Sequence, residues 1–304
     1  MIAVLGFGGS LETLLALLCL NALLAYSGFI PISGGSFSLS FVAFVGFGAY
    51  VAGILSVDHG IGLAPAIIVA PISGALIALA FAKPLERLSG MYLALVSVAI
   101  ISIFKVLAIN LTSLTGGALG KLGIAPAIGL RVLIPAVAIV AGAMALVQHS
   151  ALGRAMRMAR SDPLAAGSMG INVVRLRMWL FVASAGLASG GGVLRAYYYG
   201  SVIPVDYSFD LLVVLLAIVI LGGIGRWAGP IVGALVWTLL PEWLRPMERW
   251  RDVGIGLVLL VVILALPQGV VGGGGDLVNR ARNRYQSRRQ TRDDPAKTPA
   301  TSEL

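Results

Sequence analysis

The chain has few residues that could support metal or nucleophilic chemistry. It has one cysteine, Cys19, and two histidines, His59 and His149. One cysteine excludes a disulfide framework or a thiolate metal cluster within a chain, and two histidines in separate segments leave little for a metal site or a histidine-based triad. No G-x-x-x-x-G-K-[ST] phosphate loop occurs, so we expect no ATPase site. We therefore expect a chain that is not an enzyme, with no cofactor and no metal of its own.

Charge is also scarce. Only 12% of the 304 residues are charged while 58% are hydrophobic, and the mean hydropathy is +0.95. Soluble proteins are roughly 25% charged. The net charge of +9 is compatible with nucleic-acid binding, but the basic residues lie between long apolar runs and in the C-terminal tail, as they do in the cytoplasmic loops of membrane proteins. The composition therefore predicts a multi-pass membrane protein whose surroundings are lipid and not nucleic acid.

The apolar runs predict about nine transmembrane helices, with eight to ten as the range. Inside a bilayer every backbone N–H and C=O must be paired within the segment, so the spans should be helices, and the fold class all-α. Several are short or interrupted by Gly and Pro, which predicts broken helices. The predicted spans are Leu11–Phe29, Phe37–Leu55, Gly62–Ala82, Met91–Ile109, Val132–Val147, Trp179–Tyr197, Asp210–Gly225, Pro230–Leu244 and Val253–Val271.

Arginine-rich segments set the predicted orientation. The segment from Gln148 to Met178 has five arginines and one acidic residue, and seven basic residues follow residue 275. Because Lys and Arg accumulate in cytoplasmic loops, both segments should be cytoplasmic. We divide the chain into a transmembrane domain, residues 1–275, and a basic tail, residues 276–304. The tail has almost no large apolar residues and is predicted to be disordered.

The arginine-rich segment contains a predicted docking helix. Arg154, Arg157 and Arg160 recur every three residues and share one helix face. Asp162 is a typical N-cap, Pro163 suits the first helical position, and Gly170 suits a left-handed helix end. This pattern predicts a short helix over Pro163–Met169 that couples the spans to a partner. The alternative is a surface loop whose arginines only fix the topology. The coupling residues are Arg154, Arg157, Arg160, Asp162, Pro163, Leu164, Ala165, Ala166 and Gly170.

Small and polar residues inside the spans are candidates for a translocation path. An unwound Gly/Ser segment can offer backbone groups to a substrate where it lines a cavity. For Asn21 an interhelical hydrogen bond is the alternative. The path residues are Asn21, Gly35, Ser36, Ser38, Gly222 and Gly223. In the outer segment, Thr115, Gly116 and Gly117 form either a docking turn for a partner protein or an ordinary flexible turn.

Five segments in order resemble motifs of one family. They are residues 21–28, 35–50, 114–117, 151–177 and 221–234, which begin NALLAYSG, GSFSLSFV, LTGG, ALGRAMRM and LGGIGRWA. They resemble inner-membrane permease subunits of ABC importers for branched-chain amino acids. The resemblance implies a second related permease, two cytoplasmic ATPases that hold ATP and Mg, and an external substrate-binding protein.

Two alternatives remain open from the sequence. The same machine could move urea, short amides or other amino acids, because selection in these importers lies largely with the binding protein. A stand-alone secondary carrier or channel would need no ATPase. Ion-coupled carriers usually have ionisable groups at membrane depth, and no Asp or Glu stands out there. The sequence therefore favours the importer permease, in the inner membrane and with a cytoplasmic C-terminus.

Overall fold

Eight apolar helices form the bulk of the computed structural model. It describes residues 11–86, 88, 90–125 and 128–243, together with residues 256, 269 and 271. The eight helices are α1 (Leu11–Ser33), α2 (Phe41–Val57), α3 (Leu63–Glu86), α4 (Met91–Asn110), α6 (Leu130–His149), α9 (Val173–Tyr199), α10 (Phe209–Gly222) and α11 (Gly229–Trp243).

Each of the first eight predicted spans coincides with one of these helices. Five of them, α1, α3, α4, α6 and α9, are long and apolar enough to cross a membrane, and α2, α10 and α11 are shorter. The all-α, multi-pass class is therefore confirmed. The ninth span, Val253–Val271, lies outside the described residues apart from three single positions, and the tail 276–304 lies wholly outside them. The total of nine stays a prediction.

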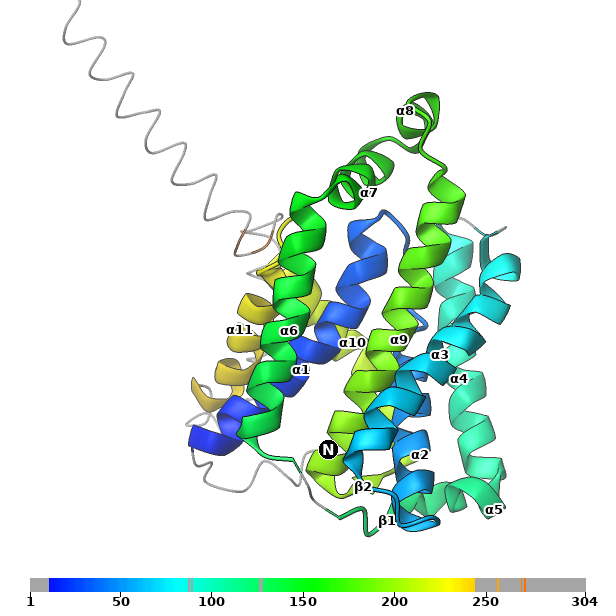
Figure 1. Ribbon diagram of the computed structural model, residues 1–304, viewed down its shortest axis with the longest axis vertical. Helices are drawn as coiled ribbons and strands as arrows, with labels where there is room; N and C mark the ends of the chain where they lie inside the picture. The colour runs from blue at the N-terminus through cyan, green and yellow to red at the C-terminus, as the bar shows by residue number, and fades with distance from the viewer. Residues whose placement is uncertain are drawn as a thin grey trace, which may run out of the picture.

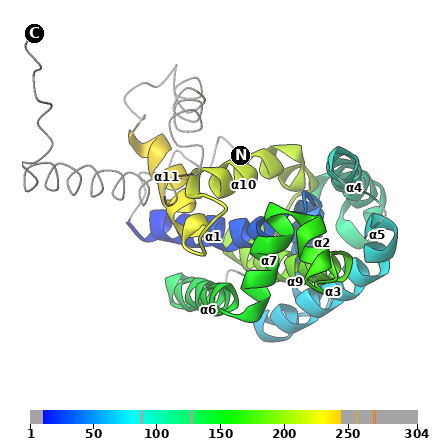
Figure 2. The same cartoon turned by 90° about the horizontal axis from the view of Figure 1, so that it is seen from above.

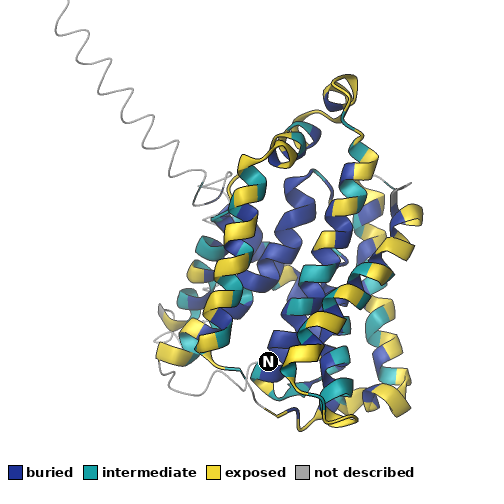
Figure 3. Ribbon diagram, viewed as in Figure 1, coloured by how far each residue is buried: buried dark blue, intermediate teal, exposed yellow. Residues whose placement is uncertain are grey.

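Helix α1 lies at the centre of the bundle (Figures 1 and 2). It contacts α9, α11, α10 and α6, while α2 and α3 pack on the other side of α9. Of its most apolar stretch 67% is buried, against 22% in each of α3, α4 and α6. These outer helices are largely exposed or half-buried (Figure 3), and their exposed residues include the large hydrophobic residues Ile68, Leu95 and Ile139. Such a surface suits lipid, and it would be an aggregation hazard in water.

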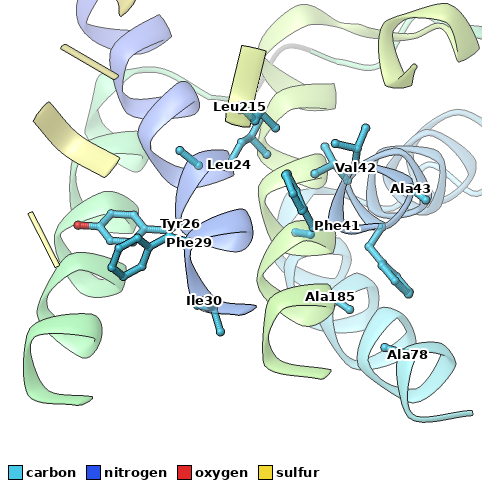
Figure 4. Packing of buried hydrophobic residues seen from close by; sticks show 14 of the residues in the cluster. Leu24, Tyr26, Phe29, Ile30, Phe41, Val42, Ala43, Ala78, Ala185 and Leu215 are labelled. Carbon is cyan, nitrogen blue, oxygen red and sulfur yellow. The ribbon is translucent and has the colours of Figure 1, made fainter. Parts of the chain in front are cut away.

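The core between the helices combines aromatic rings with very small residues. Tyr26 and Phe29 of α1 pack edge to face with their ring centroids 6.3 Å apart (Figure 4). Helices α2 and α9 approach more closely, because a Cβ atom at Gly48 or Gly192 would collide with the backbone of the other helix. Small residues permit this approach in membranes, where van der Waals packing holds helices together.

The connections lie at two opposite ends of the bundle (Figure 1). One end has the non-helical residues 34–40 and two surface helices, α7 (Ala151–Ser161) and α8 (Pro163–Ser168). The other end has α5 (Thr112–Thr115), η2 (Gly117–Leu119), η3 (Pro204–Tyr207), and a two-stranded antiparallel sheet of β1 (Lys121–Leu122) and β2 (Ser201–Val202). The sequence did not predict this sheet, because two-residue strands are too short to show alternation.

Two segments that are not α-helical enter the bundle, namely residues 34–40 at one end and residues 202–208, which include η3, at the other. Residues 34–40 precede α2, which begins at Phe41 and not at the predicted Phe37, and Ser36, Ser38 and Ser40 in this segment are buried. At the other end Val202 lies near Gly53 of α2, whereas Tyr207 lies against Gly46. At 1.5 Å per residue, these positions on α2 are about 10 Å apart along the helix axis. Helix α10 therefore begins within the bundle. Its 14 residues span about 21 Å, less than the roughly 30 Å hydrocarbon core.

Candidate translocation path and coupling site

A cavity of about 360 Å³ opens beside residues 34–40. Its walls come from this segment, from the connection between α3 and α4, and from the first turns of α9. Three predicted path residues line it, namely Gly35, Ser36 and Ser38. The volume falls within the range of small-molecule sites. The structure thus gathers half of the predicted path residues around one cavity.

The cavity combines one unpaired cationic group with apolar walls. The Nε atom of Arg177 is buried and has no hydrogen-bond partner among the described residues. The hydroxyls of Ser38 and Ser40 lie 3.3 Å apart and share a hydrogen bond. Leu85 and Phe181 supply apolar surface. A carboxylate could satisfy the guanidinium while an aliphatic chain contacts the apolar walls. This combination suits a small apolar amino acid.

The other predicted path residues lie elsewhere. Asn21 of α1 donates a hydrogen bond from Nδ2 to Oγ1 of Thr238 in α11, at 3.3 Å. This is the interhelical role that the sequence offered as the alternative to substrate contact. Gly222 packs against the backbone of Gly229, and Gly223 packs against Gly269. The late glycine break is therefore a tight contact between backbones rather than a wall of the cavity.

The Asn21–Thr238 bond predicts a coupled loss of stability. Asn21→Leu or Thr238→Val should each lower the free energy of unfolding by about 0.6 kcal/mol, the average for hydrogen bonds between membrane helices. Because both variants remove the same bond, the double variant should lose little more than either single one. Thermal unfolding of the purified permease in detergent would measure this. Fully additive losses would show that the bond contributes nothing.

The loop between α10 and α11 is held from two sides. The hydroxyl of Tyr26 in α1 donates to the carbonyl oxygen of Trp227 at 2.8 Å, and the N–H of Trp227 donates to Oε1 of Gln148 at the same distance. Gln148 is in the last turn of α6, which leads into α7. The loop is therefore fixed both to the central helix and to the helix that leads into α7.

Helix α8 has the caps that the sequence predicted. Oδ1 of Asp162 accepts hydrogen bonds from the N–H groups of Leu164 at 2.9 Å and Ala165 at 3.1 Å. Pro163 occupies the first turn. The helix ends at Ser168, one residue before the predicted end, and Gly170 has the expected left-handed backbone with φ +83°. The predicted short helix is confirmed.

Helix α8 also protrudes from the rest of the molecule (Figure 1). Leu164 is 86% exposed and Met169 is 70% exposed, whereas Ala166 is fully buried. Two exposed apolar side chains on a capped, projecting helix form a small surface suited to a groove in a partner. Ala165 is exposed as well, so most of the predicted coupling residues in α8 are free to contact another protein.

Helix α7 connects this projection to both glycine-rich segments. At Gly35, which has φ +76°, a Cβ atom would lie 2.8 Å from Cα of Arg160. Nη1 of Arg160 donates to the carbonyl oxygen of Ile224 at 3.1 Å, next to the late glycine break. Nη1 of Arg157 donates to the carbonyl oxygen of Gln148 at 2.9 Å. Arg157 and Arg160 therefore tie α7 to α6 and to the α10–α11 loop from the surface, and Gly35 packs directly on α7.

The Asp162 cap predicts a measurable loosening of α8. Asp162→Ala should cost about 1 kcal/mol of helix stability, because two N–H groups lose their acceptor. At 1.4 kcal/mol per factor of ten, amide exchange at Leu164 and Ala165 should rise about fivefold. Hydrogen–deuterium exchange mass spectrometry would measure the rates. Asp162→Asn retains an accepting oxygen and should exchange at nearly the wild-type rate. Equal exchange in Asp162→Ala and wild type would contradict the cap assignment.

The predicted docking turn lies at the opposite end. Oγ1 of Thr115 donates to the carbonyl oxygens of Ala108 and Leu111, both at 2.7 Å, and accepts from the N–H of Gly117 at 3.2 Å. Thr115 and Gly117 are buried, and Gly116 is exposed with φ +77°. Thr115 and Gly117 thus shape the turn from inside, and Leu119, 79% exposed, forms part of its outer surface.

One nearly buried ionisable residue of the bundle was not predicted as functional from the sequence. Arg195 lies in α9 and is 8% exposed, with its guanidinium 5.6 Å from the ring centre of Tyr199 and 5.2 Å from that of Tyr207. A single arginine inside the predicted span Trp179–Tyr197 is a signal in itself, because charged residues at membrane depth are costly and usually functional.

These features define a multi-pass α-helical membrane protein with a capped projecting helix at one end. Its sequence matches the model of the branched-chain amino acid transport system permease component family over residues 10–266. The chain belongs to this family. The five segments that resemble the family's motifs all lie within this range, in α1, in the 34–40 segment with α2, in the α5–η2 turn, from α7 to the start of α9, and in the α10–α11 region.

Several characterised permeases are similar to the chain. The high-affinity branched-chain amino acid transport system permease protein LivM of Escherichia coli K12 is 26% identical over 286 residues, which is 83% of this chain and 66% of LivM. LivH of the same strain is 31% identical over 41% of each chain. The fructose import permease protein FruG of Bifidobacterium longum is 30% identical over 48% of this chain and 44% of FruG. The chain spans slightly less than two thirds of LivM. No solved structure shows a significant match.

Proposed function

We propose that the chain is a transmembrane permease subunit of an ABC importer for branched-chain amino acids, driven by ATP hydrolysis in partner subunits. The observation that carries the proposal is the position of α7, which packs on Gly35 beside the cavity and donates to Ile224 beside the late glycine break. Helix α8 projects from the same loop. A partner that moves α8 would therefore move α7 against both segments.

The proposed substrate follows from the relatives and from the cavity. LivM and LivH are named as high-affinity permeases for branched-chain amino acids. The cavity has an unpaired guanidinium nitrogen at Arg177 and apolar walls at Leu85 and Phe181. A branched aliphatic amino acid has a carboxylate that could pair with Arg177 and a hydrocarbon chain that could contact the apolar walls. A sugar such as fructose would leave the guanidinium without a counter-charge.

The proposed partners follow from the two ends of the molecule. Two cytoplasmic ATPase subunits, which hold ATP and Mg, would receive α8, and a second related permease would complete the membrane part. An external substrate-binding protein would dock near the turn around Gly116. In this proposed arrangement the chain lies in the inner membrane. The α7–α8 loop and the C-terminus then face the cytoplasm.

Reconstitution into liposomes tests the proposed function. With the second permease, the ATPases and the binding protein present, we expect leucine uptake only when ATP is supplied on the side of the membrane that carries the ATPase subunits. The chain alone should show neither ATPase activity nor uptake. Fructose should not be taken up by the same assembly. Ion-driven leucine uptake by liposomes that contain this chain alone would overturn the proposal in favour of a secondary carrier.

A further inference from the structure

A second polar cluster lies at the end of the bundle opposite to the cavity. Its centre is Arg195, which is 8% exposed and packs between the rings of Tyr199 and Tyr207. Cation–π contact with two rings stabilises the guanidinium but fills none of its five N–H donors. Among the described residues Arg195 has no hydrogen bond and no ion pair, since Lys121–Asp58 is the one ion pair there. A nearly buried cation is thus left without an acceptor.

An acidic residue lies on the same short segment as one of these rings. Asp206 precedes Tyr207 in η3, is half-buried, and makes no ion pair or side-chain hydrogen bond in the part of the chain described. Tyr207 experiences both charges. Burial is the main cause that raises its pKa to about 12, with Arg195 opposing the rise and Asp206 adding to it. Two opposite charges therefore act on one ring without forming an ion pair with each other.

A third group completes the cluster. The hydroxyl of Tyr50 in α2 is buried and has no hydrogen-bond partner among the described residues. Its ring packs at 61° to that of Phe104, with the centroids 6.1 Å apart, and Phe104 belongs to α4. A buried unpaired hydroxyl costs about 1–3 kcal/mol, so such groups usually have a ligand or water as partner. The cluster therefore offers a cation, an anion and an unused hydroxyl within an aromatic setting.

We propose that Arg195 and Asp206 form a binding site for a free α-amino acid zwitterion at the outer end of the permease. Arg195 binds the α-carboxylate, with Tyr50 as a further donor, and Asp206 binds the α-ammonium group. The tyrosine rings contact the hydrocarbon side chain. This inference rests on the proposed function, because it places the entry point of the imported amino acid at the end where the binding protein would release it.

The chemistry of the cluster favours a zwitterion over a ligand with one charge. The carboxylate of a simple carboxylic acid would pair with Arg195, but its negative charge would be repelled by the nearby carboxylate of Asp206. An amine would satisfy Asp206 and be repelled by Arg195. An α-amino acid carries both charges on one carbon atom and neutralises both side chains together. Arg195 and Tyr207 are nearly buried, and low exposure strengthens a charge–charge contact.

Ligand binding to the purified importer without its binding protein tests the site. All proteins would carry Arg177→Gln, so that the cavity at the opposite end does not contribute. Saturation-transfer difference NMR would compare L-leucine with 3-methylbutylamine, which lacks the carboxylate, and 4-methylpentanoate, which lacks the ammonium group. We expect leucine to bind at least tenfold more tightly than either analogue.

Two variants should change this preference in opposite directions. Arg195→Gln should weaken leucine binding at least tenfold and tighten binding of the amine, because the amine is no longer repelled by Arg195. Asp206→Asn should weaken leucine binding at least tenfold and tighten binding of the acid, because the acid is no longer repelled by Asp206. Arg195→Lys retains the charge and should recover part of the leucine binding. Arg131→Gln removes an exposed cation at the same end and should bind all three ligands as the starting protein does.

Two results would overturn the proposed site. One is that both variants bind leucine with an unchanged dissociation constant. The other is an equal loss for all three ligands, which would show that the residues only support the fold. The outcome is separable from the proposed function. If liposomes import leucine but the variants bind it normally, only the zwitterion site is wrong; if the complete wild-type assembly imports no leucine, the proposed function is wrong.

Discussion

Replacing Gly35 by alanine should reduce leucine uptake by more than tenfold. Gly35 has φ +76°, a conformation that costs a residue with a side chain roughly 1–3 kcal/mol. The added Cβ atom would also lie 2.8 Å from Cα of Arg160 and 3.3 Å from the carbonyl oxygen of Ala159. Both atoms belong to backbone, so neither can rotate away. Either α7 or the 34–40 segment must shift. The contact between α7 and this segment, which lines the cavity, is then lost.

The Gly35 prediction has a matched control. Gly60 has φ +63° but has no atom within 4 Å of an added Cβ, so Gly60→Ala carries similar backbone strain without the collision. Initial rates of ATP-driven leucine uptake in liposomes would compare the two. Because α8 is untouched, the ATPase subunits should still co-purify with Gly35→Ala. Equal uptake by Gly35→Ala and Gly60→Ala would contradict the role of this contact.

Replacing Gly170 by valine should reduce the amount of ATPase that co-purifies with the permease to less than a tenth. Gly170 has φ +83° and follows α8 closely. A β-branched side chain is strongly disfavoured in this backbone region. No atom lies within 4 Å of an added Cβ, so the effect arises from the backbone alone. The chain after α8 must take another path, which reorients the exposed Leu164 and Met169.

Gly123 provides the control for this variant. It has φ +86°, again with no atom within 4 Å of an added Cβ, but it lies at the opposite end of the bundle. Gly123→Val should strain its own turn to the same degree and leave ATPase co-purification intact. Quantitative co-purification from membranes with equal permease content would measure both. Wild-type co-purification by Gly170→Val would mean that α8 does not couple the subunits.

Much of the fold follows from local chemistry that a sequence displays. Apolar runs place eight helices, because pairing of the backbone in lipid leaves few other solutions. The α8 caps could be predicted because Asp162, Pro163 and Gly170 each act on their own neighbours. The start of α2 could not. Phe37 and Leu39 extend the apolar run of the span toward its start, but Gly35 packs against α7, a contact across 125 positions that no local pattern records.

The residues of the candidate site also differ in whether their role follows from neighbouring sequence or from distant contacts. Gly35, Ser36 and Ser38 were predicted and line the cavity, since an unwound polar segment is visible in the sequence. For Asn21 the sequence already favoured an interhelical hydrogen bond over substrate contact, and the structure confirms that bond, but its partner Thr238 lies too far along the chain to be predicted. The sequence around Gly222 and Gly223 does not distinguish glycines that line a cavity from glycines that allow two backbones to pack closely. Arg195 went unnoticed because its two tyrosines meet it only in three dimensions.

The most direct measurement is photo-crosslinking from α8. Cys19 is the one cysteine of the chain and is buried, so a Cys19→Ser background allows a single new cysteine to be labelled with a benzophenone. Leu164→Cys lies at the exposed tip of α8, and Leu119→Cys, of similar exposure, lies at the opposite end. Coupling through α8 predicts an adduct between Leu164→Cys and an ATPase subunit in the assembled importer, and none from Leu119→Cys. Absence of the adduct at Leu164→Cys, or equal adducts from both positions, would contradict the account.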